Sequence, residues 1–563
     1  MNRCVSVALA AAMIWAVPAW GAPPATHFQK CDGFFQPPKP KNLLQTLFLV
    51  KGGSIGAQRL QNIALGADGV TACNTALVDP LLTEADWMRR VSLLQARAVH
   101  HLAAGQSDAA MADLAQAEAA ARDPNDPYYG RSLGLGNQIV RAFALREQTH
   151  GAEADALVAK ILAERPYNRQ IALALVSVAP DLTTLVGGEP VLLPVARLQP
   201  KLIDTIFAEH FRRRDFPAMI ALFPHLQPPT KILDRGAVNR LGTDLAEDRN
   251  EVVSALFMAE RRAELAYAYA ALGNAAAAQA ELDKADASLN SIKALPPVPA
   301  GEKEGKKARA LRLMNTIAVS ATTTFRERLA SWRQMVGLRL KVGEGETPDS
   351  FAQLPKLLPN AAALDLLTAI DARRPNFPGA DGAIAELEKV TAAKPFPKKE
   401  ALELLWAGLP YSEAAEKIST FRKANSPFEQ LMWGGVSGFK TKPNPDGSIT
   451  VSFTSTKSNG TVVEEMALLR AADYVREQGK NGLVIKSRAD FQRTIVYGYY
   501  GVASGPGTPD GYSTDLTIEP VDKTNLPALY RSAPWRVLDA QAIIDRLEPI
   551  YRQPAATQAA SAH

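Results

Sequence analysis

The sequence AERRAELAYAYAALGNAAAAQAELDKADASLN, residues 259–290, contains two helical patterns separated by a turn. Leu265, Ala266 and Tyr269 recur on one face of the first pattern, as in an amphipathic helix. Gly273, which precedes an asparagine, marks the turn. The residues that share one face of the second pattern are Ala278, Leu282 and Ala285. Small residues on both faces allow two helices to approach closely, so this stretch predicts a helical hairpin.

Two other stretches have the same order of residues. In residues 88–121, Ala98 is the small residue and Gly105 the turn. The predicted second-helix face of that stretch consists of Ala110, Leu114 and Ala117. A weaker match in residues 139–166 keeps the spacing at Ala144, Gly151, Ala156 and Ala163. The three turn glycines are unevenly spaced along the chain, so any repeat array is irregular.

This order (leucine, small residue, aromatic, glycine, alanine, large apolar residue, alanine) resembles that of tetratricopeptide repeats. The resemblance implies that the hairpins stack, because one hairpin cannot bury its apolar face alone. The alternative is a set of helical hairpins without true repeat geometry. We therefore expect a mainly α protein, an α-solenoid of tetratricopeptide-like hairpins followed by a small C-terminal α+β domain.

Changes in composition divide the chain into six segments. They are a signal peptide (1–22), a cysteine-containing lead-in (23–80), repeat-like helices (81–295), further helical hairpins (306–425), an α+β domain (434–552) and a disordered tail (553–563). The lead-in is rich in proline around Cys31, which predicts irregular structure there. The last predicted helix of the second helical segment covers 398–424.

The α+β segment begins with alternating residues typical of a strand, 448–453. An amphipathic helix is predicted over 461–478, because a glycine stop follows it. Three further strands and a closing helix are predicted over 482–486, 491–499, 512–519 and 538–550. The stretch Val451-Ser452-Phe453, the helix sequence 467–472 and Gln478-Gly479 together resemble a domain of bacterial envelope lipoproteins of unknown function. The resemblance covers part of this segment and brings no catalytic residues.

The N-terminus predicts export. Residues 1–3 are a short basic start, 4–17 are apolar, and 18–22 supply small residues for cleavage. An uncleaved anchor is the alternative. No later apolar run is long enough to span a membrane, so we expect a periplasmic or secreted protein without a membrane span after cleavage. Cys31 and Cys73 then form an even pair in an oxidising compartment, which predicts a disulfide.

Charge and motifs give little support for catalysis or nucleic-acid binding. The 563 residues carry a formal charge of +5 without a concentrated basic face, which argues against nucleic acid. Gly52–Gly56 matches G-x-S-x-G, but the surrounding parallel sheet and the later acid and histidine are missing. His100 and His101 are adjacent in a helix and diverge by about 100°, so they cannot share a metal ion. We expect no catalytic residues, no metal and no cofactor.

A glycine-rich segment near the C-terminus, 501–511, is surrounded by tyrosines that we consider candidate partner contacts. They are Tyr497, Tyr499, Tyr500 and Tyr512. The alternative is an ordinary hairpin connection with strand tyrosines facing a core. The first functional hypothesis is a non-catalytic scaffold or adaptor that binds a protein or peptide of the cell envelope. The second is a small-ligand protein or enzyme with its site between the helices and the α+β domain.

Overall fold

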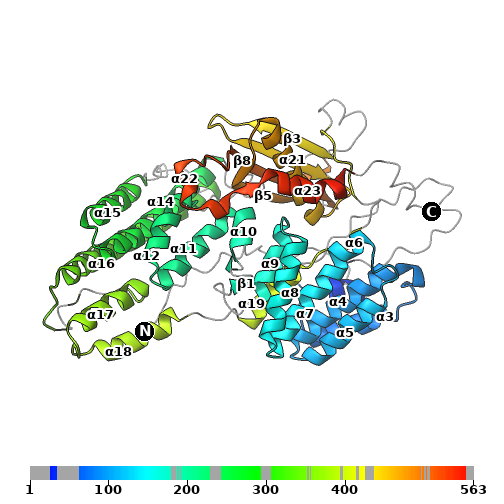
Figure 1. Ribbon diagram of the computed structural model, residues 1–563, viewed down its shortest axis with the longest axis horizontal. Coiled ribbons are helices and arrows are strands. Elements are labelled where there is room, and N and C mark those ends of the chain that lie inside the picture. Colours follow the sequence, from blue (N-terminus) through cyan, green and yellow to red (C-terminus); the bar gives the residue numbers. More distant parts are fainter. Residues whose placement is uncertain are drawn as a thin grey trace.

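The structure, a computed structural model, is mainly helical, with a small antiparallel five-stranded sheet near the C-terminus (Figure 1). It describes residues 26–34, 63–178, 185–186, 189–190, 192–228, 243–292, 306–350, 354, 357–392, 397–413, 418–424, 437–495, 498–499, 502–503 and 508–552. The predicted signal peptide, Ser54 of the G-x-S-x-G match and the predicted C-terminal tail lie outside these residues. Figure 1 shows two groups of helices side by side, with the sheet and its helices beside the group that contains the N-terminal helices.

The N-terminal group of helices has its own hydrophobic core. Its members are α1 (His27–Asp32), α3 (Ala67–Leu77), α4 (Trp87–Ala103), α5 (Ser107–Ala119), α7 (Leu135–Glu147), α8 (Gly151–Glu164), α9 (Arg169–Val178) and α19 (Lys398–Gly408). The last of these comes from far along the chain. Its Trp406 is buried against the ring of His100, with 5.6 Å between ring centroids.

The second group of helices surrounds another core. It contains α10 (Leu192–Leu198), α11 (Ile203–Arg212), α12 (Phe216–Leu222), α14 (Thr243–Ala271), α15 (Ala275–Asn290), α16 (Lys306–Glu344), α17 (Ala361–Arg373) and α18 (Ala380–Thr391). Trp332 of α16 and Tyr267 of α14 are fully buried at its centre. The repeat-like segment expected over 81–295 is thus divided between two cores, and α9 contributes residues to both.

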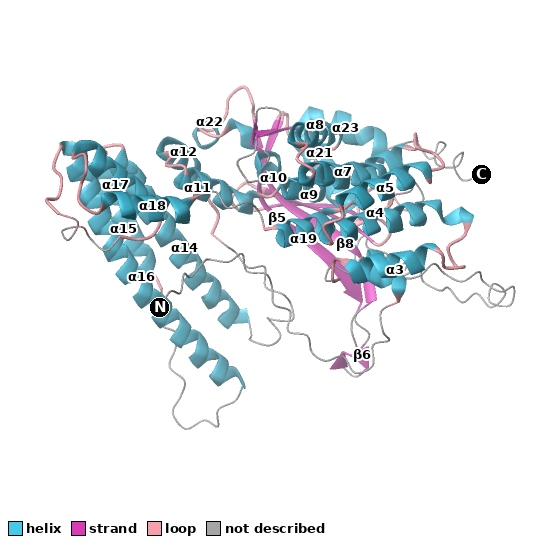
Figure 2. Cartoon of the chain, turned by 90° about the horizontal axis from the view of Figure 1, so that it is seen from below, coloured by secondary structure: helices cyan, strands magenta, loops and turns pink. Residues whose placement is uncertain are grey.

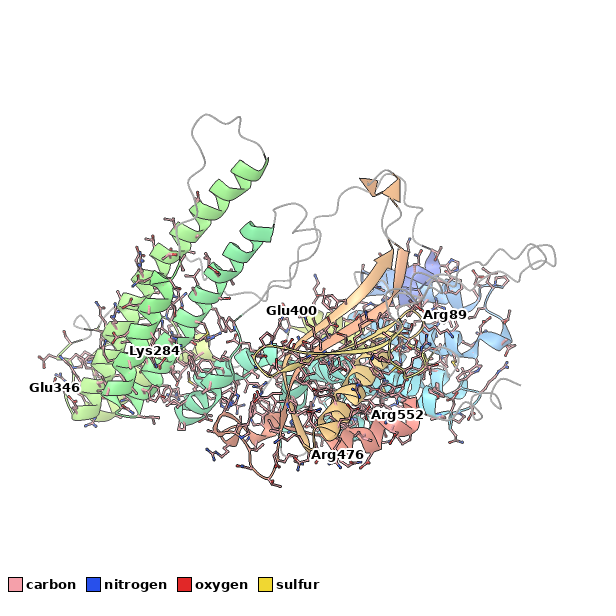
Figure 3. The ribbon with its side chains drawn as sticks, turned by 90° about the horizontal axis from the view of Figure 1, so that it is seen from above. Arg89, Lys284, Glu346, Glu400, Arg476 and Arg552 are labelled. Carbon is pink, nitrogen blue, oxygen red and sulfur yellow. A yellow bond between two sulfur atoms is a disulfide. The ribbon has the colours of Figure 1, made fainter. Side chains whose placement is uncertain are left out.

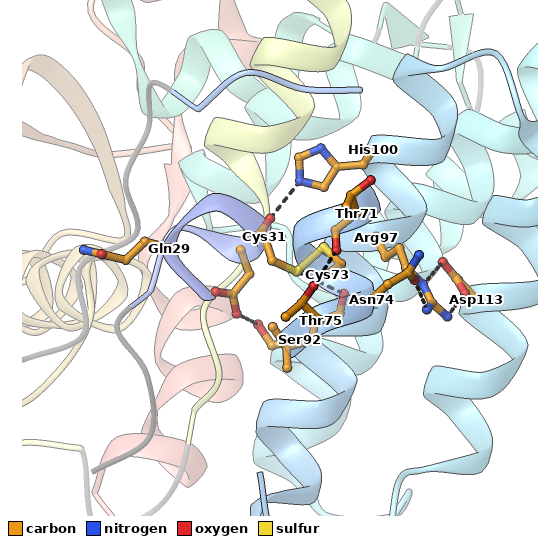
Figure 4. The surroundings of a disulfide bond; sticks show 12 residues. Gln29, Cys31, Thr71, Cys73, Asn74, Thr75, Ser92, Arg97, His100 and Asp113 are labelled. Atoms are coloured by element: carbon orange, nitrogen blue, oxygen red, sulfur yellow. Dashed lines mark hydrogen bonds and ion pairs between the residues drawn. A yellow bond between two sulfur atoms is a disulfide. The ribbon is translucent and has the colours of Figure 1, made fainter. Parts of the chain in front are cut away.

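The lead-in contains a helix that the proline-rich sequence did not predict. Thr26 caps α1 by accepting a hydrogen bond from the Gln29 amide, while the Gln29 side chain accepts one from the Thr26 amide. Cys31 of α1 and Cys73 of α3 lie at disulfide-bonding distance, with 2.12 Å between sulfurs (Figure 4). The pairing predicted from the sequence therefore joins α1 to α3.

Three helical hairpins share one geometry. Each turns at a residue with left-handed backbone: Gly105 (φ 76°), Thr149 (φ 67°) and Gly273 (φ 78°). The residue seven positions earlier is in each case a fully buried alanine: Ala98, Ala142 and Ala266. Positions five, nine and twelve after the turn are buried in all three: Ala110, Leu114 and Ala117; Ala154, Val158 and Ile161; Ala278, Leu282 and Ala285. The helix pairs α4–α5, α7–α8 and α14–α15 therefore pack in the same register.

The packed face of α8 differs from the one expected. Ala156 and Ala163 are exposed, and the buried face lies two residues earlier. The reason is that the turn occurs at Thr149, while Gly151 is already the first residue of α8. Ala144 of α7 is fully buried. In α14, Leu265 is buried, but Tyr269 is half-buried and Tyr267 is the aromatic residue inside the core.

The last helix of the helical segment is shorter than expected. The sequence predicted a helix over 398–424, whereas α19 ends at Gly408. Pro410 follows two residues later and cannot continue a helix. Among the residues described beyond it, 418–424 are not helical, and Lys423 forms a parallel bridge with Phe439.

The C-terminal sheet has the strand order β3-β4-β8-β5-β9, and every pair of neighbours is antiparallel. The strands are β3 (Gly438–Pro443), β4 (Ile449–Ser455), β5 (Gly482–Ile495), β8 (Thr508–Val521) and β9 (Leu538–Asp539). Alternate residues of β4 are buried, which matches its predicted period of two. The strand expected over 482–486 and the first part of the one expected over 491–499 form one continuous strand, β5, which ends at Ile495 and has an irregularity between Ile485 and Ser487.

Two helices complete the C-terminal domain. α21 (Gly460–Glu477) packs on β4, β5 and β8, and α23 (Ala540–Tyr551) packs on α21. Asn459 caps α21 by accepting a hydrogen bond from the Val462 amide at 3.0 Å. The described chain also contains the short strand pairs β1 (Leu185–Val186) with β2 (Glu189–Pro190), and β6 (Gly498–Tyr499) with β7 (Val502–Ala503). In Figure 2, β5 and β8 run together toward β6.

Candidate functional site

Two adjacent glutamates of α21, Glu464 and Glu465, point into the contact between the C-terminal domain and the N-terminal helices. Glu465 is fully buried and Glu464 is nearly so. Their neighbours one helical turn away on either side, such as Val462 and Leu469, are also buried. The sequence therefore places two ionisable groups on the apolar side of a helix, where each requires a partner.

Glu465 receives both of its arginine partners from the N-terminal helices. Arg165, directly after α8, places Nε 2.6 Å from Oε1 and Nη2 3.2 Å from Oε2. Arg131, from the π-helical segment Gly130–Gly134, donates to Oε2 through Nη2. Tyr551 of α23 also donates to Oε2, and the Asn168 amide donates to Oε1 at 3.2 Å. Each oxygen of the Glu465 carboxylate thus accepts hydrogen bonds from at least two donors.

A second buried carboxylate, Glu413, balances the two arginines. It comes from the stretch that follows α19, and its Oε1 lies 2.8 Å from Arg165 Nη2. Its Oε2 lies 2.9 Å from Arg131 Nε, and Thr461 donates a hydrogen bond to Oε1 at 3.2 Å. We call Arg131, Arg165, Glu413, Glu465 and Tyr551 the charged junction. Its two cations and two anions have no net charge.

The electrostatics of the charged junction favour the charged forms of Glu465 and Arg165. Burial alone would raise the pKa of Glu465, but Arg131 and Arg165 outweigh it and lower that pKa to about 2. Burial alone would lower the pKa of Arg165, and the two glutamates raise it well above its ordinary value. Since both carboxylate side chains are 0% exposed, a reactant in solution cannot reach them in this conformation. The geometry therefore favours a contact that positions two parts of the chain.

The neighbouring Glu464 forms a similar cluster with the sheet. Arg488 of β5 donates to Glu464 Oε2 and lies 2.8 Å from Asp490 Oδ2 through Nε. Arg169 of α9 approaches the same Asp490 oxygen at 3.3 Å, and the Gln170 amide donates to Glu464 Oε1 at 3.2 Å. Adjacent residues of α21 are thus tied to α9, to Arg165 after α8 and to Arg131 before α7.

A third polar contact joins the second helical group to the C-terminal domain. His225, at the end of the 3-10 turn Phe223–His225, is buried and accepts a hydrogen bond from Arg536 at 3.2 Å through Nδ1. Its ring stacks on Tyr530, with 5.8 Å between centroids. Arg536 also donates to the Ile485 carbonyl at 2.9 Å. Burial and the adjacent Arg536 lower the pKa of His225 to about 4, so the imidazole is neutral at pH 7.

On the outside of the same domain lies an open groove of about 500 Å³. We call it the arginine groove, and it is lined by Phe421, Arg422, Phe439, Arg470, Asp473, Arg476, Glu477 and Arg552. These residues come from the stretch 418–424, β3, α21 and the end of α23. Arg476 and Arg552 are labelled on the C-terminal domain in Figure 3. The groove combines several cations with two aromatic rings, so it is suited to binding an anionic group.

Of the four tyrosines predicted as partner contacts, the structure describes the side chain of Tyr512 alone. Tyr497 and Tyr500 lie outside the described residues, and for Tyr499 only its backbone in β6 is described. Tyr512 is half-buried beside the core of the C-terminal domain. Its pKa is raised by burial and by Tyr411.

The adjacent histidines have separate packing roles. The His100 ring bonds to the Cys31 carbonyl at 2.8 Å (Figure 4). Its Nδ1 accepts a hydrogen bond from the Gly66 amide at 3.3 Å. His101 bonds to the Gln106 side chain at 2.6 Å. Within the described ranges, no group of three or more histidine, cysteine, aspartate or glutamate side chains is arranged to hold a metal ion. None of the described helices is long and apolar enough to cross a membrane.

The charged junction was missed by sequence reasoning, although part of its signal was present. Glu464 and Glu465 interrupt an otherwise apolar helix face, which indicates buried or functional carboxylates. Their partners Arg131, Arg165 and Glu413 carry no comparable signal, because nothing in the sequence shows that they converge. Comparison with known proteins adds no relative: no family model, no curated protein and no solved structure matches this chain.

Proposed function

We propose that this protein is an exported, non-catalytic helical-repeat adaptor that binds another protein or peptide of the cell envelope. The observation that carries the proposal is the charged junction. A neutral set of four buried charges fixes the C-terminal domain against the N-terminal helices, so surfaces on both parts keep a constant relation. An adaptor requires that its binding surfaces keep a constant position and orientation relative to each other.

Two further features support the proposal. The hairpins of α4–α5, α7–α8 and α14–α15 share one packing register, as expected for repeat-like units. The N-terminus has the composition of a signal peptide, and the cysteine pair at disulfide distance suits an oxidising compartment. We place the protein in the periplasm or outside the cell on these grounds.

In-cell photocrosslinking tests the adaptor function. A photoreactive amino acid is placed at Leu272 and at Val390, which are 52% and 49% exposed, and at the fully buried Trp332 as a control. We expect the exposed positions to yield the same covalently bound envelope protein in repeated experiments, and Trp332 to yield none. If neither exposed position, nor a wider set of exposed positions, yields a reproducible adduct, the adaptor function is wrong.

The alternative function, a small-ligand protein or enzyme with its site at the contact between helices and sheet, makes a different prediction. It requires a ligand to enter near Glu413 and Glu465, whose side chains are fully buried and ion-paired. A thermal-shift screen of cell-wall fragments, sugars and lipids distinguishes the two functions. Strong stabilisation that is lost in the Glu465→Gln variant would favour the alternative.

A further inference from the structure

The arginine groove contains two kinds of arginine. Arg470 is held by Glu477 through contacts of 2.5 and 3.1 Å, and its guanidinium lies 4.8 Å from the centre of the Phe439 ring. Arg552 similarly lies 4.7 Å from the centre of the Phe421 ring. It bonds to Asp473 and, at 2.7 Å, to Glu548. These two arginines are fixed by carboxylates and by aromatic faces, and form a rigid lining.

The other two arginines of the groove have no acidic partner among the described residues. Arg422 and Arg476 are exposed, and neither forms an ion pair with any residue that the structure describes. The lining holds four arginines and two acidic residues, Asp473 and Glu477. Glu548, which pairs with Arg552, adds a third negative charge, so an excess of one positive charge remains. A planar guanidinium fits a carboxylate through two parallel hydrogen bonds.

An open strand edge borders the same groove. The Phe439 amide donates to the Arg422 carbonyl at 2.8 Å, and the Ala424 amide donates to the Phe439 carbonyl at 2.9 Å. In this parallel pairing, the amide and carbonyl of Lys423 point away from β3. In the described part of the chain, neither group has a hydrogen-bond partner. Such an edge can pair with a further extended chain.

We propose that the arginine groove binds an extended, acidic peptide segment of a partner protein. The segment pairs with the backbone of Lys423, and its carboxylates contact Arg422 and Arg476. Excess positive charge selects the acidic side chains, and the free backbone groups favour a peptide over a phosphate or a lipid headgroup, which has no amide to donate. This inference rests on the proposed adaptor function, for which it supplies the chemical class of the partner.

Fluorescence anisotropy with the full-length mature protein tests the proposal. The probe is a labelled decapeptide of alternating glutamate and threonine. We expect the Arg422→Gln/Arg476→Gln variant to bind it at least tenfold more weakly. The matched control is Arg326→Gln/Arg531→Gln, which removes the same charge from exposed arginines of α16 and α22 (Ala528–Arg531). We expect this control to bind within about twofold of wild type. Unchanged circular dichroism confirms that both variants are folded.

Two altered probes test the peptide chemistry. A decapeptide with glutamine in place of glutamate tests the charge, and one with N-methylated threonines tests backbone pairing. We expect both to bind at least tenfold more weakly than the parent. The inference is overturned if wild type does not bind the parent probe, if the control variant loses as much affinity, or if N-methylation has no effect. It is also overturned if inorganic phosphate or phosphatidylglycerol vesicles bind through Arg422 and Arg476 and the peptide does not.

The same variant separates this inference from the adaptor function. If photocrosslinking in cells captures the envelope partner equally well with Arg422→Gln/Arg476→Gln, the groove is not the partner site, while the adaptor function stands. If the probe binds as expected but no partner is captured in cells, the adaptor function fails and the groove remains a peptide site.

Discussion

Arg165 and Glu465 are 300 residues apart in the chain, yet Nε of the arginine lies 2.6 Å from Oε1 of the glutamate, and both side chains are almost completely buried. The arginine follows a helix of the N-terminal group, and the glutamate belongs to the helix that packs on the C-terminal sheet. Together with Arg131, Glu413 and Tyr551 they form the charged junction. This contact is one of those that hold the two parts of the chain together, and it leads to the first prediction.

The substitution Glu465→Gln should destabilise the protein strongly. It removes one anion from a buried, neutral set of charges, so Arg131 and Arg165 are left with only Glu413 as a charged partner. We expect the free energy of unfolding to fall by about 3 kcal/mol, the range for breaking one side of a buried ion pair. Urea denaturation followed by circular dichroism measures the loss.

The control for this prediction is Glu548→Gln, which removes a partly exposed glutamate paired with Arg552. Exposed pairs contribute little, so we expect a loss below about 1 kcal/mol. Equal losses for the two variants would contradict the view that the charged junction holds the domains together.

Mild acid should weaken the contact that involves His225. In the folded protein the pKa of His225 is about 4, below the ordinary value of 6.5. As the pH falls, His225 therefore binds a proton in the unfolded chain before it does so in the folded protein. This contribution to stability is complete above pH 6.5 and is lost progressively between pH 6.5 and 4. At pH 5 the loss relative to pH 7.5 is about 2 kcal/mol.

Unfolding free energies of wild type and His225→Asn at the two pH values measure this contribution. We expect the variant to lose about 2 kcal/mol less than wild type on acidification. His150→Asn is the control, because His150 is largely exposed and takes no part in the contact between His225 and Arg536. If His225→Asn retains the full acid sensitivity, the titration belongs to another group.

Breaking the disulfide between Cys31 and Cys73 should destabilise the N-terminal helices. The residues are 42 positions apart, so the link restricts a long loop of the unfolded chain. We expect the Cys31→Ser/Cys73→Ser variant to lose about 2–4 kcal/mol of unfolding free energy. Wild type treated with a reductant should show the same loss, and the reductant should have no effect on the variant. Thiol labelling of both cysteines in the unreduced protein would show that the bond does not form.

The parts of the fold that the sequence predicted depend on local patterns. Alternation over 448–453 and the glycine stop after α21 were sufficient to place β4 and that helix, and the cysteine pair was identified by composition. The charged junction could not be predicted in this way. Its members lie far apart in the chain, and a single arginine such as Arg165 looks the same in sequence whether it ends in solvent or beside a buried glutamate. The groove depends likewise on the return of 418–424 to the edge of β3.

The register of α8 provides the last prediction, because the packed face of this helix differs from the one that its sequence pattern predicts. A left-handed turn at Thr149 places Ala154 in the core and leaves Ala156 exposed. The two alanines lie on the same helix and can receive the same substitution. Ala154→Leu forces three additional carbon atoms into a packed face, which we expect to cost about 1–3 kcal/mol. Ala156→Leu projects outward and should change the unfolding free energy by less than about 0.5 kcal/mol.

Thermal and urea denaturation of the two variants measure the difference directly. Since leucine and alanine are both good helix formers, helix propensity affects the two sites alike, and the difference reports burial. The opposite order, with Ala156→Leu the more damaging change, would mean that Gly151 begins the repeat turn as the sequence spacing suggested. It would also remove α7–α8 from the hairpins that share the packing register of α4–α5 and α14–α15.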